Sequence, residues 1–232
     1  MRKLKSHVTG YFRRRHLRLR SITGKGLSRS DDFVELYVLA CLLKYIHGAV
    51  PANLEAGKTF IVALSPSSNW SDASWFQCSG NSSTYGLRTG LEVTAFADPG
   101  TVELDVLFVN LSNPLGPDVP GSIVEAAFEC KVHKRSIDQT KANEVIGKAY
   151  RVWGQLPVPL LSGPPDVQRY AVLSSSAATP KAGDALNSVA IAFEMLASAS
   201  FSGRLGKVVT ALGLIVRAPK SSPKSKKAAT GP

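Results

Sequence analysis

Apolar positions along the chain fall into runs that predict helices and strands in a defined order. Residues 31–47 are apolar nearly all round a helix, which indicates a helix buried on several sides. Residues 102–110 and 123–132 are apolar runs of strand length, and we expect them to pair in an antiparallel manner. Residues 137–153 carry apolar side chains with a period of 3.6, which predicts an amphipathic helix.

Weaker patterns predict the remaining elements. Five are expected: strands at 58–64, 91–97 and 168–174, a helix at 184–199, and a strand or helix at 207–216. Residues 65–90 are rich in Ser, Asn, Gly and Trp, so we expect a long loop or irregular insert there. The prolines and glycines of residues 110–122 predict a second loop.

Up to residue 174, and with the short strand 91–97 left out, the order of these elements is helix, three strands, helix, strand. A strand–helix–strand crossover joins parallel strands, whereas the preceding strands follow one another closely enough to be antiparallel. We therefore predict an α/β fold with a mixed central sheet that is flanked by helices.

Charge is distributed unevenly and divides the chain into three parts. The net charge is +11, yet all 17 acidic residues lie between Asp31 and Glu194. Residues 1–30 hold ten Lys and Arg without one acid, and residues 217–232 hold five more. We therefore predict a basic N-terminal arm over 1–30, a domain over 31–216 and a basic disordered tail over 217–232.

Three interpretations of the N-terminal arm remain open. Arginines alternate there with Tyr11, Phe12 and His16, a pattern that favours contact with nucleic-acid phosphates. The arm could instead be a solvated tail, or an organelle transit peptide because it is rich in Arg and free of acids. The candidate phosphate contacts in the arm are Arg13, Arg14 and Arg15.

Features that would place the chain in a membrane or a secretory route are missing from the sequence pattern. No apolar run is long enough for a membrane span, and the basic start lacks the apolar core of a secretory signal. The three cysteines, Cys41, Cys78 and Cys130, are scattered and odd in number, which favours a reducing compartment over a disulfide framework. We expect a cytoplasmic protein without membrane association.

Two acids and one lysine on the predicted strands carry the candidate chemistry. Asp105 lies inside the apolar run 102–110, while Glu129 and Lys131 lie two residues apart in the run 123–132. Side chains two residues apart share one face of a strand, and buried charges are costly unless they are paired or bound to a metal. Carboxylate oxygens suit Mg²⁺, which can activate water for phosphodiester cleavage.

The motifs around these residues resemble the PD-(D/E)xK nuclease superfamily, and most of all its Mrr-type and CRISPR-associated effector members. Leu104-Asp105-Val106 matches the first acid motif, although Leu104 stands where proline is usual, and Glu129-Cys130-Lys131 matches the second. The resemblance implies a restriction endonuclease-like αβββαβ core. It also implies a Mg²⁺-dependent, or Mn²⁺-dependent, DNA endonuclease of a bacterial restriction or defence type, which could be a homodimer.

The resemblance further implies roles for individual residues. Asp105, Glu129 and Lys131 would be catalytic, and the metal would be held by Asp105 and Glu129, with the Cys130 carbonyl and Glu35 as further ligands. Residues that follow the second motif could contact the phosphate backbone, and they are His133, Lys134, Arg135, Gln139 and Lys141.

Two other classes of protein fit the same sequence. One is a nucleic-acid-binding module that has a nuclease fold without catalysis. The other is an assembly protein that coats nucleic acid with its basic segments.

Overall fold

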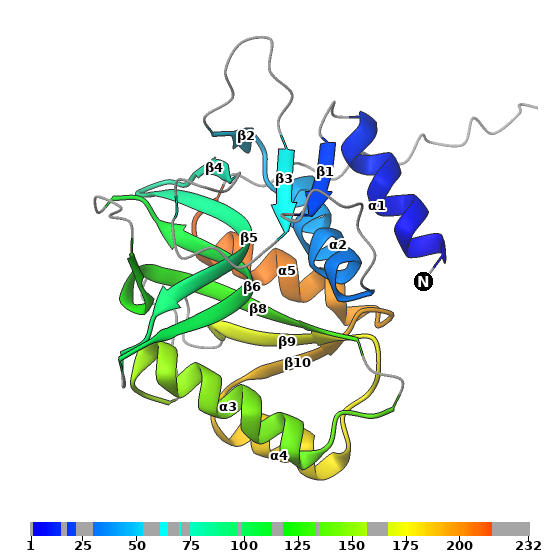
Figure 1. Ribbon diagram of the computed structural model, residues 1–232, viewed down its shortest axis with the longest axis vertical. Coiled ribbons are helices and arrows are strands. Elements are labelled where there is room, and N and C mark those ends of the chain that lie inside the picture. Colours follow the sequence, from blue (N-terminus) through cyan, green and yellow to red (C-terminus); the bar gives the residue numbers. More distant parts are fainter. Residues whose placement is uncertain are drawn as a thin grey trace, which may run out of the picture.

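A computed structural model describes most of the chain as helices and strands on a mixed β-sheet (Figure 1). The described residues are 2–14, 18–21, 30–52, 61–64, 70, 75–96, 99–112, 118–132, 135–156 and 167–214. The helices are α1 (Arg2–Arg14), α2 (Ser30–Tyr45), α3 (Gln139–Trp153), α4 (Pro180–Ser188) and α5 (Ser200–Ala211), with a 3₁₀ turn, η2 (Gly121–Ile123). The strands are β1 (Arg18–Ser21), β2 (Val50–Pro51), β3 (Ile61–Leu64), β4 (Phe76–Ser79), β5 (Thr84–Thr94), β6 (Thr101–Asn110), β7 (Val119–Pro120), β8 (Val124–Lys131), β9 (Tyr170–Ser174) and β10 (Ala192–Met195).

Eight of the described strands form one mixed sheet, which confirms the predicted fold class. The order is β10-β9-β8-β6-β5-β4-β2, and β7 pairs with β5. The pairs β2–β4, β4–β5, β5–β6 and β6–β8 are antiparallel, whereas β8–β9, β9–β10 and β5–β7 are parallel. Because parallel neighbours need a crossover connection, α3 lies between β8 and β9, and α4 lies between β9 and β10.

Helices cover both faces of this sheet and create two apolar cores. Helices α1, α2 and α5 lie on one face, and α3 and α4 lie on the other (Figure 1). The first core joins α2 to side chains such as Phe108 and Phe128, while the second joins α3 to side chains such as Leu107 and Ala127. Strands β6 and β8 contribute to both cores, so they are buried on both faces, as their continuous apolar runs require.

Helix α1 explains why α2 lacks a polar face. Val8, Tyr11 and Phe12 of α1 are buried in the first core, and the two helices are in contact. The ammonium group of Lys5 lies 4.7 Å from the Phe33 ring centroid, and that of Lys44 lies 5.4 Å from the Tyr11 ring centroid. The first part of the basic N-terminal segment is therefore a packed helix, with cations over aromatic rings at its margin.

Most of the long elements agree with the sequence prediction. The helices α2 and α3 and the strands β6, β8 and β9 lie within a few residues of the predicted ranges, and β8 is antiparallel to β6 as expected. Within the predicted strand 58–64, the structure describes residues 61–64, which form β3. This strand pairs with β1 in a separate two-stranded parallel sheet. The predicted tail, residues 217–232, lies outside the described residues.

The predicted loop over 65–90 is wrong in its second half. That half contains β4 and the first residues of β5, which form an antiparallel hairpin. Its glycines suggested a loop, but Gly86 is a packing position within the strand: a Cβ there would lie 2.4 Å from the ring of Trp70. Strand β5 is thus longer than the predicted strand 91–97 because the glycine makes room for an aromatic ring.

The predicted helix over 184–199 is also wrong, because this segment contains a helix end and a strand. The α4 helix starts earlier, where the Thr179 hydroxyl accepts a hydrogen bond from the Ala182 N–H and Pro180 occupies the first turn. It ends before Ala190, which has a φ of 54°. The following residues pair with β9 as β10, and the last predicted element is the helix α5, which begins at Ser200.

No helix in the described part of the chain is both long and apolar enough to cross a membrane.

Two glycines near α3 provide a test of how this helix packs on the sheet. A Cβ at Gly121 would lie 2.3 Å from the Val152 carbonyl oxygen, whereas a Cβ at Gly147 would meet nothing within 4 Å. We expect Gly121→Ala to destabilise the protein by about 1–3 kcal/mol, because α3 must shift. Gly147→Ala should stabilise it by about 0.5–1 kcal/mol through helix propensity. Urea unfolding of both variants measures the two effects, and equal stabilities would contradict this packing.

Candidate active site

The two candidate acids come from adjacent strands and lie side by side on one face of the sheet. Strands β6 and β8 pair with Val106 opposite Phe128, and continuing this register by one residue places Asp105 opposite Glu129. Lys131 follows two residues after Glu129 and therefore points to the same face of β8. The structure brings the three residues together, and the Lys131 ammonium contacts the Glu129 Oε1 atom.

Asp105 lies at the point in the β5–β6 hairpin where the side chains on one face switch from the first apolar core to the second. Leu87 and Phe108 belong to the first core, whereas Leu91 and Leu104 belong to the second. In each strand the two residues are separated by an even number of positions, so a regular strand would direct them to one face. The change occurs beside Gly90, whose φ is 55°. The hairpin is therefore twisted at the candidate acid.

Backbone and side-chain groups hold the Asp105 carboxylate against β8. Its Oδ2 atom accepts a 2.6 Å hydrogen bond from the Cys130 N–H. Its Oδ1 atom lies 4.0 Å from the Nζ atom of Lys148, which comes from α3. The residue is 8% exposed, so the carboxylate has little access to bulk water.

Glu129 accepts contacts from three different elements. The ammonium groups of Lys131 and Lys148 each contact one of its carboxylate oxygens. The Tyr170 hydroxyl on β9 donates a 2.9 Å hydrogen bond to Oε2. The Tyr170 ring is itself packed edge-on against Trp153, with the ring centroids 5.3 Å apart. Glu129 is 2% exposed, and these partners replace the water that it loses.

The cluster of Asp105, Glu129, Lys131, Lys148 and Tyr170, called here the carboxylate–lysine cluster, holds two acids and two ammonium groups. Burial and the nearby Glu129 raise the pKa of Asp105 to about 7, against the opposing effect of the lysines. Burial would also raise the pKa of Glu129, but Lys148 and Lys131 outweigh it and keep that pKa below its ordinary value. Glu129 is thus the ionised acid, and Asp105 can hold a proton near neutral pH.

Lys148 and Tyr170 were not predicted as site residues. Lys148 lies in the predicted amphipathic helix 137–153, next to the buried stripe formed by Val145, Ala149 and Val152. In the sequence, this position at the edge of the apolar stripe was the feature that could have indicated a lysine with a partly buried side chain. Tyr170 gave no such signal, because only the parallel pairing of β9 with β8 places it near Glu129.

Cys130 and Glu35 lie towards the other face of the sheet. The Cys130 side chain is buried in the first core, and α2, which carries Glu35, packs on that face of β8. Burial, Asp105 and Glu35 all raise the pKa of the Cys130 thiol. Among the described residues, no three His, Cys, Asp or Glu side chains gather as a possible metal site. The structure therefore does not bring Glu35 to Asp105 and Glu129 as a third ligand.

The candidate nucleic-acid contacts are only partly described. Arg13 on α1 and Arg135 before α3 are exposed. Gln139 donates a 2.9 Å hydrogen bond to Asn143, and Lys141 forms an ion pair with Glu144 at 2.7 Å. Arg15, His133, Lys134 and the side chain of Arg14 lie outside the described residues.

The donor set of the cluster suits a hard divalent cation such as Mg²⁺ or Mn²⁺. Asp105 and Glu129 offer carboxylate oxygens from neighbouring strands, and Mg²⁺ needs few protein ligands because it retains several waters. Burial and the adjacent Glu129 raise the pKa of Asp105 because both disfavour its charged form. A bound cation would favour that charged form, so the residues fit the metal.

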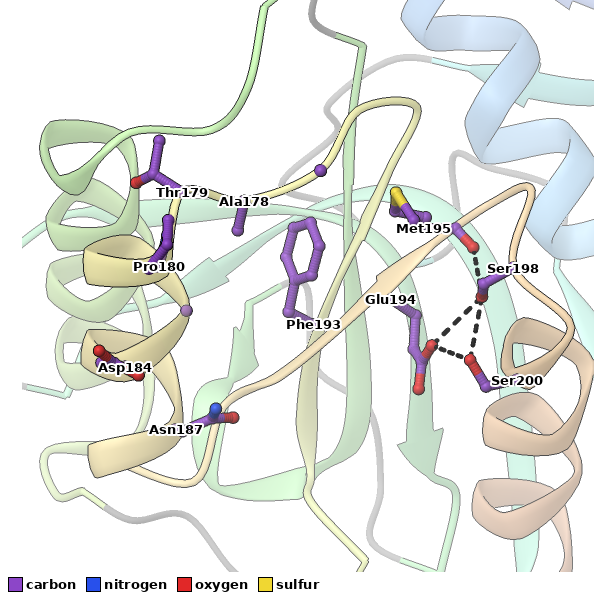
Figure 2. Close-up of a pocket in the computed structure, with 12 residues that line it drawn as sticks. Ala178, Thr179, Pro180, Asp184, Asn187, Phe193, Glu194, Met195, Ser198 and Ser200 are labelled. Carbon is purple, nitrogen blue, oxygen red and sulfur yellow. Dashed lines mark hydrogen bonds between the residues drawn. The ribbon is translucent and has the colours of Figure 1, made fainter.

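A pocket lies between α4 and β10, and none of the residues that line it belongs to the carboxylate–lysine cluster (Figure 2). In its wall Glu194 accepts hydrogen bonds from Ser198 at 3.3 Å and Ser200 at 2.6 Å, and it lies 3.6 Å from the Arg204 Nε atom. These polar groups therefore satisfy one another, and we assign no chemistry to them.

Comparisons with known proteins found no similarity: no protein-family model matches the chain, and no curated protein or solved structure is significantly similar to it.

The raised pKa of Asp105 predicts how stability changes with pH. Its pKa is about 7 in the folded protein against an ordinary value of 3.8, so only the folded protein retains this proton between about pH 4 and about pH 7. Wild-type protein should therefore lose stability as the pH rises through that window. Asp105→Asn lacks the titrating group, so it should gain stability relative to wild type, on the order of 4 kcal/mol over the window.

Urea unfolding at several pH values between 4 and 8 measures this difference. Asp184→Asn, which changes an exposed acid on α4, serves as the matched control. A difference between Asp105→Asn and wild type that stays constant, or that falls with rising pH, would contradict the assignment.

Proposed function

We propose that the protein is a metal-dependent phosphodiesterase that cleaves DNA. The observation that carries the proposal is the pair of buried carboxylates, Asp105 and Glu129, on adjacent strands with the Lys131 ammonium in contact with one of them. This is the combination of groups that the Asp and Glu-x-Lys motifs predict. Evolution rarely retains two buried acids side by side without a partner that requires both.

The element order provides independent support. When the short strands β2, β3, β4 and β7 are set aside, helix α2, the antiparallel strands β5, β6 and β8, the crossover helix α3 and the parallel strand β9 follow the αβββαβ order of a restriction endonuclease-like core. The candidate residues lie on the second and third of these strands, where the family places its acids and its lysine. The type of biological role, bacterial restriction or defence, rests on the resemblance alone, and so does the possible homodimer. The proposed cytoplasmic location rests on the scattered cysteines and the missing pattern of a secretory signal.

Individual residues take distinct roles in the proposed reaction. Asp105 and Glu129 would hold Mg²⁺ or Mn²⁺, which lowers the pKa of water and offsets phosphate charge when bound. Lys131 is one-third exposed, so its ammonium group can reach a phosphate oxygen or the attacking water while it stays beside Glu129. Tyr170 holds the Glu129 carboxylate in place through its hydroxyl. Cys130 fixes the Asp105 carboxylate through its backbone N–H.

The charge count of the cluster favours one alternative function. Two ammonium groups already face two carboxylates, so the cluster is satisfied without any cation and could be a purely structural ion-pair network. The protein would then be a nucleic-acid-binding module, or an assembly protein, that uses its basic segments and has no catalytic site. The raised pKa of Asp105, which burial and the nearby Glu129 cause, is a feature that acids in catalytic sites also show.

Cleavage assays with substitutions of similar size test the proposal. We expect Asp105→Asn, Glu129→Gln and Lys131→Met each to lower the rate of DNA cleavage by about 100-fold or more, since each removes a group that would hold the metal or act on the reacting phosphate. Supercoiled plasmid, linear duplex, single-stranded DNA and RNA are incubated with Mg²⁺ or Mn²⁺, and a chelator control is run for each substrate.

Glu103→Gln is the matched control for these variants, because Glu103 is an exposed acid on the same strand as Asp105. It should leave cleavage unchanged. Wild-type protein that binds DNA but cleaves none of the substrates would favour the binding module. Cleavage that persists in Asp105→Asn would refute the assigned site.

Nucleic-acid binding is predicted to depend on exposed arginines and on salt. Arg13→Ala and Arg135→Ala should each weaken binding to duplex DNA of any sequence, and each should lower the slope of log affinity against log salt by about 1 for every lost phosphate contact. Fluorescence anisotropy at several salt concentrations measures both quantities. Lys181→Ala, which removes an exposed lysine on α4, is the control, and an equal loss in that variant would show only a net-charge effect.

A further inference from the structure

Lys148 lies against both acids of the carboxylate–lysine cluster. Its Nζ atom contacts Glu129 Oε2 and lies 4.0 Å from Asp105 Oδ1, whereas Lys131 contacts the other Glu129 oxygen, Oε1. A divalent ion bound by both acids needs an oxygen of each within about 2.0–2.6 Å. The ammonium group of Lys148 therefore occupies space between the acids that such an ion would require.

Charge balance points in the same direction. Asp105 and Glu129 are 8% and 2% exposed, and their two negative charges already face the ammonium groups of Lys131 and Lys148. A divalent cation added to this arrangement would leave two uncompensated positive charges in a site with little water, which is unfavourable. One ammonium group has to leave when the cation binds.

The position of Lys148 on α3 allows its ammonium group to move from the cluster to solvent. The side chain is 20% exposed and has a flexible four-carbon stem, so its head can move to solvent without any backbone change. Glu144 lies four residues earlier on the same helix and is exposed, and a Glu placed four residues before a Lys is the favourable orientation for a helical ion pair. In the described structure Glu144 pairs with Lys141, which is also exposed and could release it.

We propose that Lys148 is an internal substitute for the divalent cation: it holds the two carboxylates together in the metal-free protein and leaves the site, towards Glu144, when the cation binds. Lys148 is thus a positioning residue that competes with the metal. This inference rests on the proposed function, because it concerns the same site.

Metal affinity tests the competition without any measurement of cleavage. The full chain is titrated with Mn²⁺ alone by isothermal titration calorimetry, as wild type and as Lys148→Gln and Lys148→Met. We expect both variants to bind Mn²⁺ at least tenfold more tightly than wild type, because the competing ammonium group is gone. The control is Lys181→Gln, an exposed lysine on α4, which should bind as wild type does.

Thermal unfolding gives a second readout, in which the response to Mn²⁺ separates competition from a merely structural role. Without metal, both Lys148 variants should melt at a lower temperature than wild type in either case, because Glu129 loses one of its cations. Saturating Mn²⁺ should then raise the melting temperature of the variants more than that of wild type, since at one Mn²⁺ concentration the stabilisation grows with the logarithm of the affinity. A Lys148→Met protein that is unfolded alone and folds on addition of Mn²⁺ would support the inference equally.

The outcomes separate this inference from the proposed function. Mn²⁺ binding by wild type that is unchanged or weaker in both Lys148 variants would overturn the competition and leave the metal-dependent reaction standing. Absence of Mn²⁺ binding in wild type and in both variants would overturn the competition and metal dependence together. A Lys148→Met protein that stays unfolded at saturating Mn²⁺, combined with unchanged affinity in Lys148→Gln, would also count against the competition.

Discussion

The burial of a charged carboxylate, Glu129, in the middle of the sheet is the constraint on which the rest of the arrangement depends. Removing an ion of this size from water costs several kcal/mol even in a relaxed protein, so groups in direct contact with the carboxylate must offset that cost. The fold supplies two ammonium groups and one hydroxyl, each from a defined element. The strand that bears Glu129 could not stay buried on both faces without them.

These partners meet because of the connectivity around β8. Strand β8 has β6 on one side and β9 on the other, so it collects Asp105 from an antiparallel neighbour and Tyr170 from a parallel one. The parallel pairing in turn requires a crossover, and the crossover helix α3 lays Lys148 over the same face. The mixed topology of the sheet therefore also brings together the residues of the carboxylate–lysine cluster.

The same arrangement links stability to function. A site that carries its own cations is stable in the absence of a metal, and under the proposed function those cations lie where the metal would bind, so the energy that stabilises the metal-free protein would oppose metal binding. Asp105 is the acid of the pair whose charged form is disfavoured, because burial and the nearby Glu129 raise its pKa. The basic α1 helix lies on the opposite face of the sheet, and its cations over aromatic rings are independent of this balance.

The sequence by itself determined the α/β class, the long helices, the apolar strands and the placement of Asp105, Glu129 and Lys131 on two of those strands, because periodicity and charge inside apolar runs are local properties. It misjudged residues 65–90 and 184–199, where a glycine that makes room for Trp70 and a helix end before Ala190 outweighed composition. Only the tertiary structure decided that Lys148 and Tyr170 complete the cluster and that Glu35 lies on the other side. The pairing of strands and the packing of a crossover helix join residues far apart in the chain, and no local pattern encodes which of them will meet.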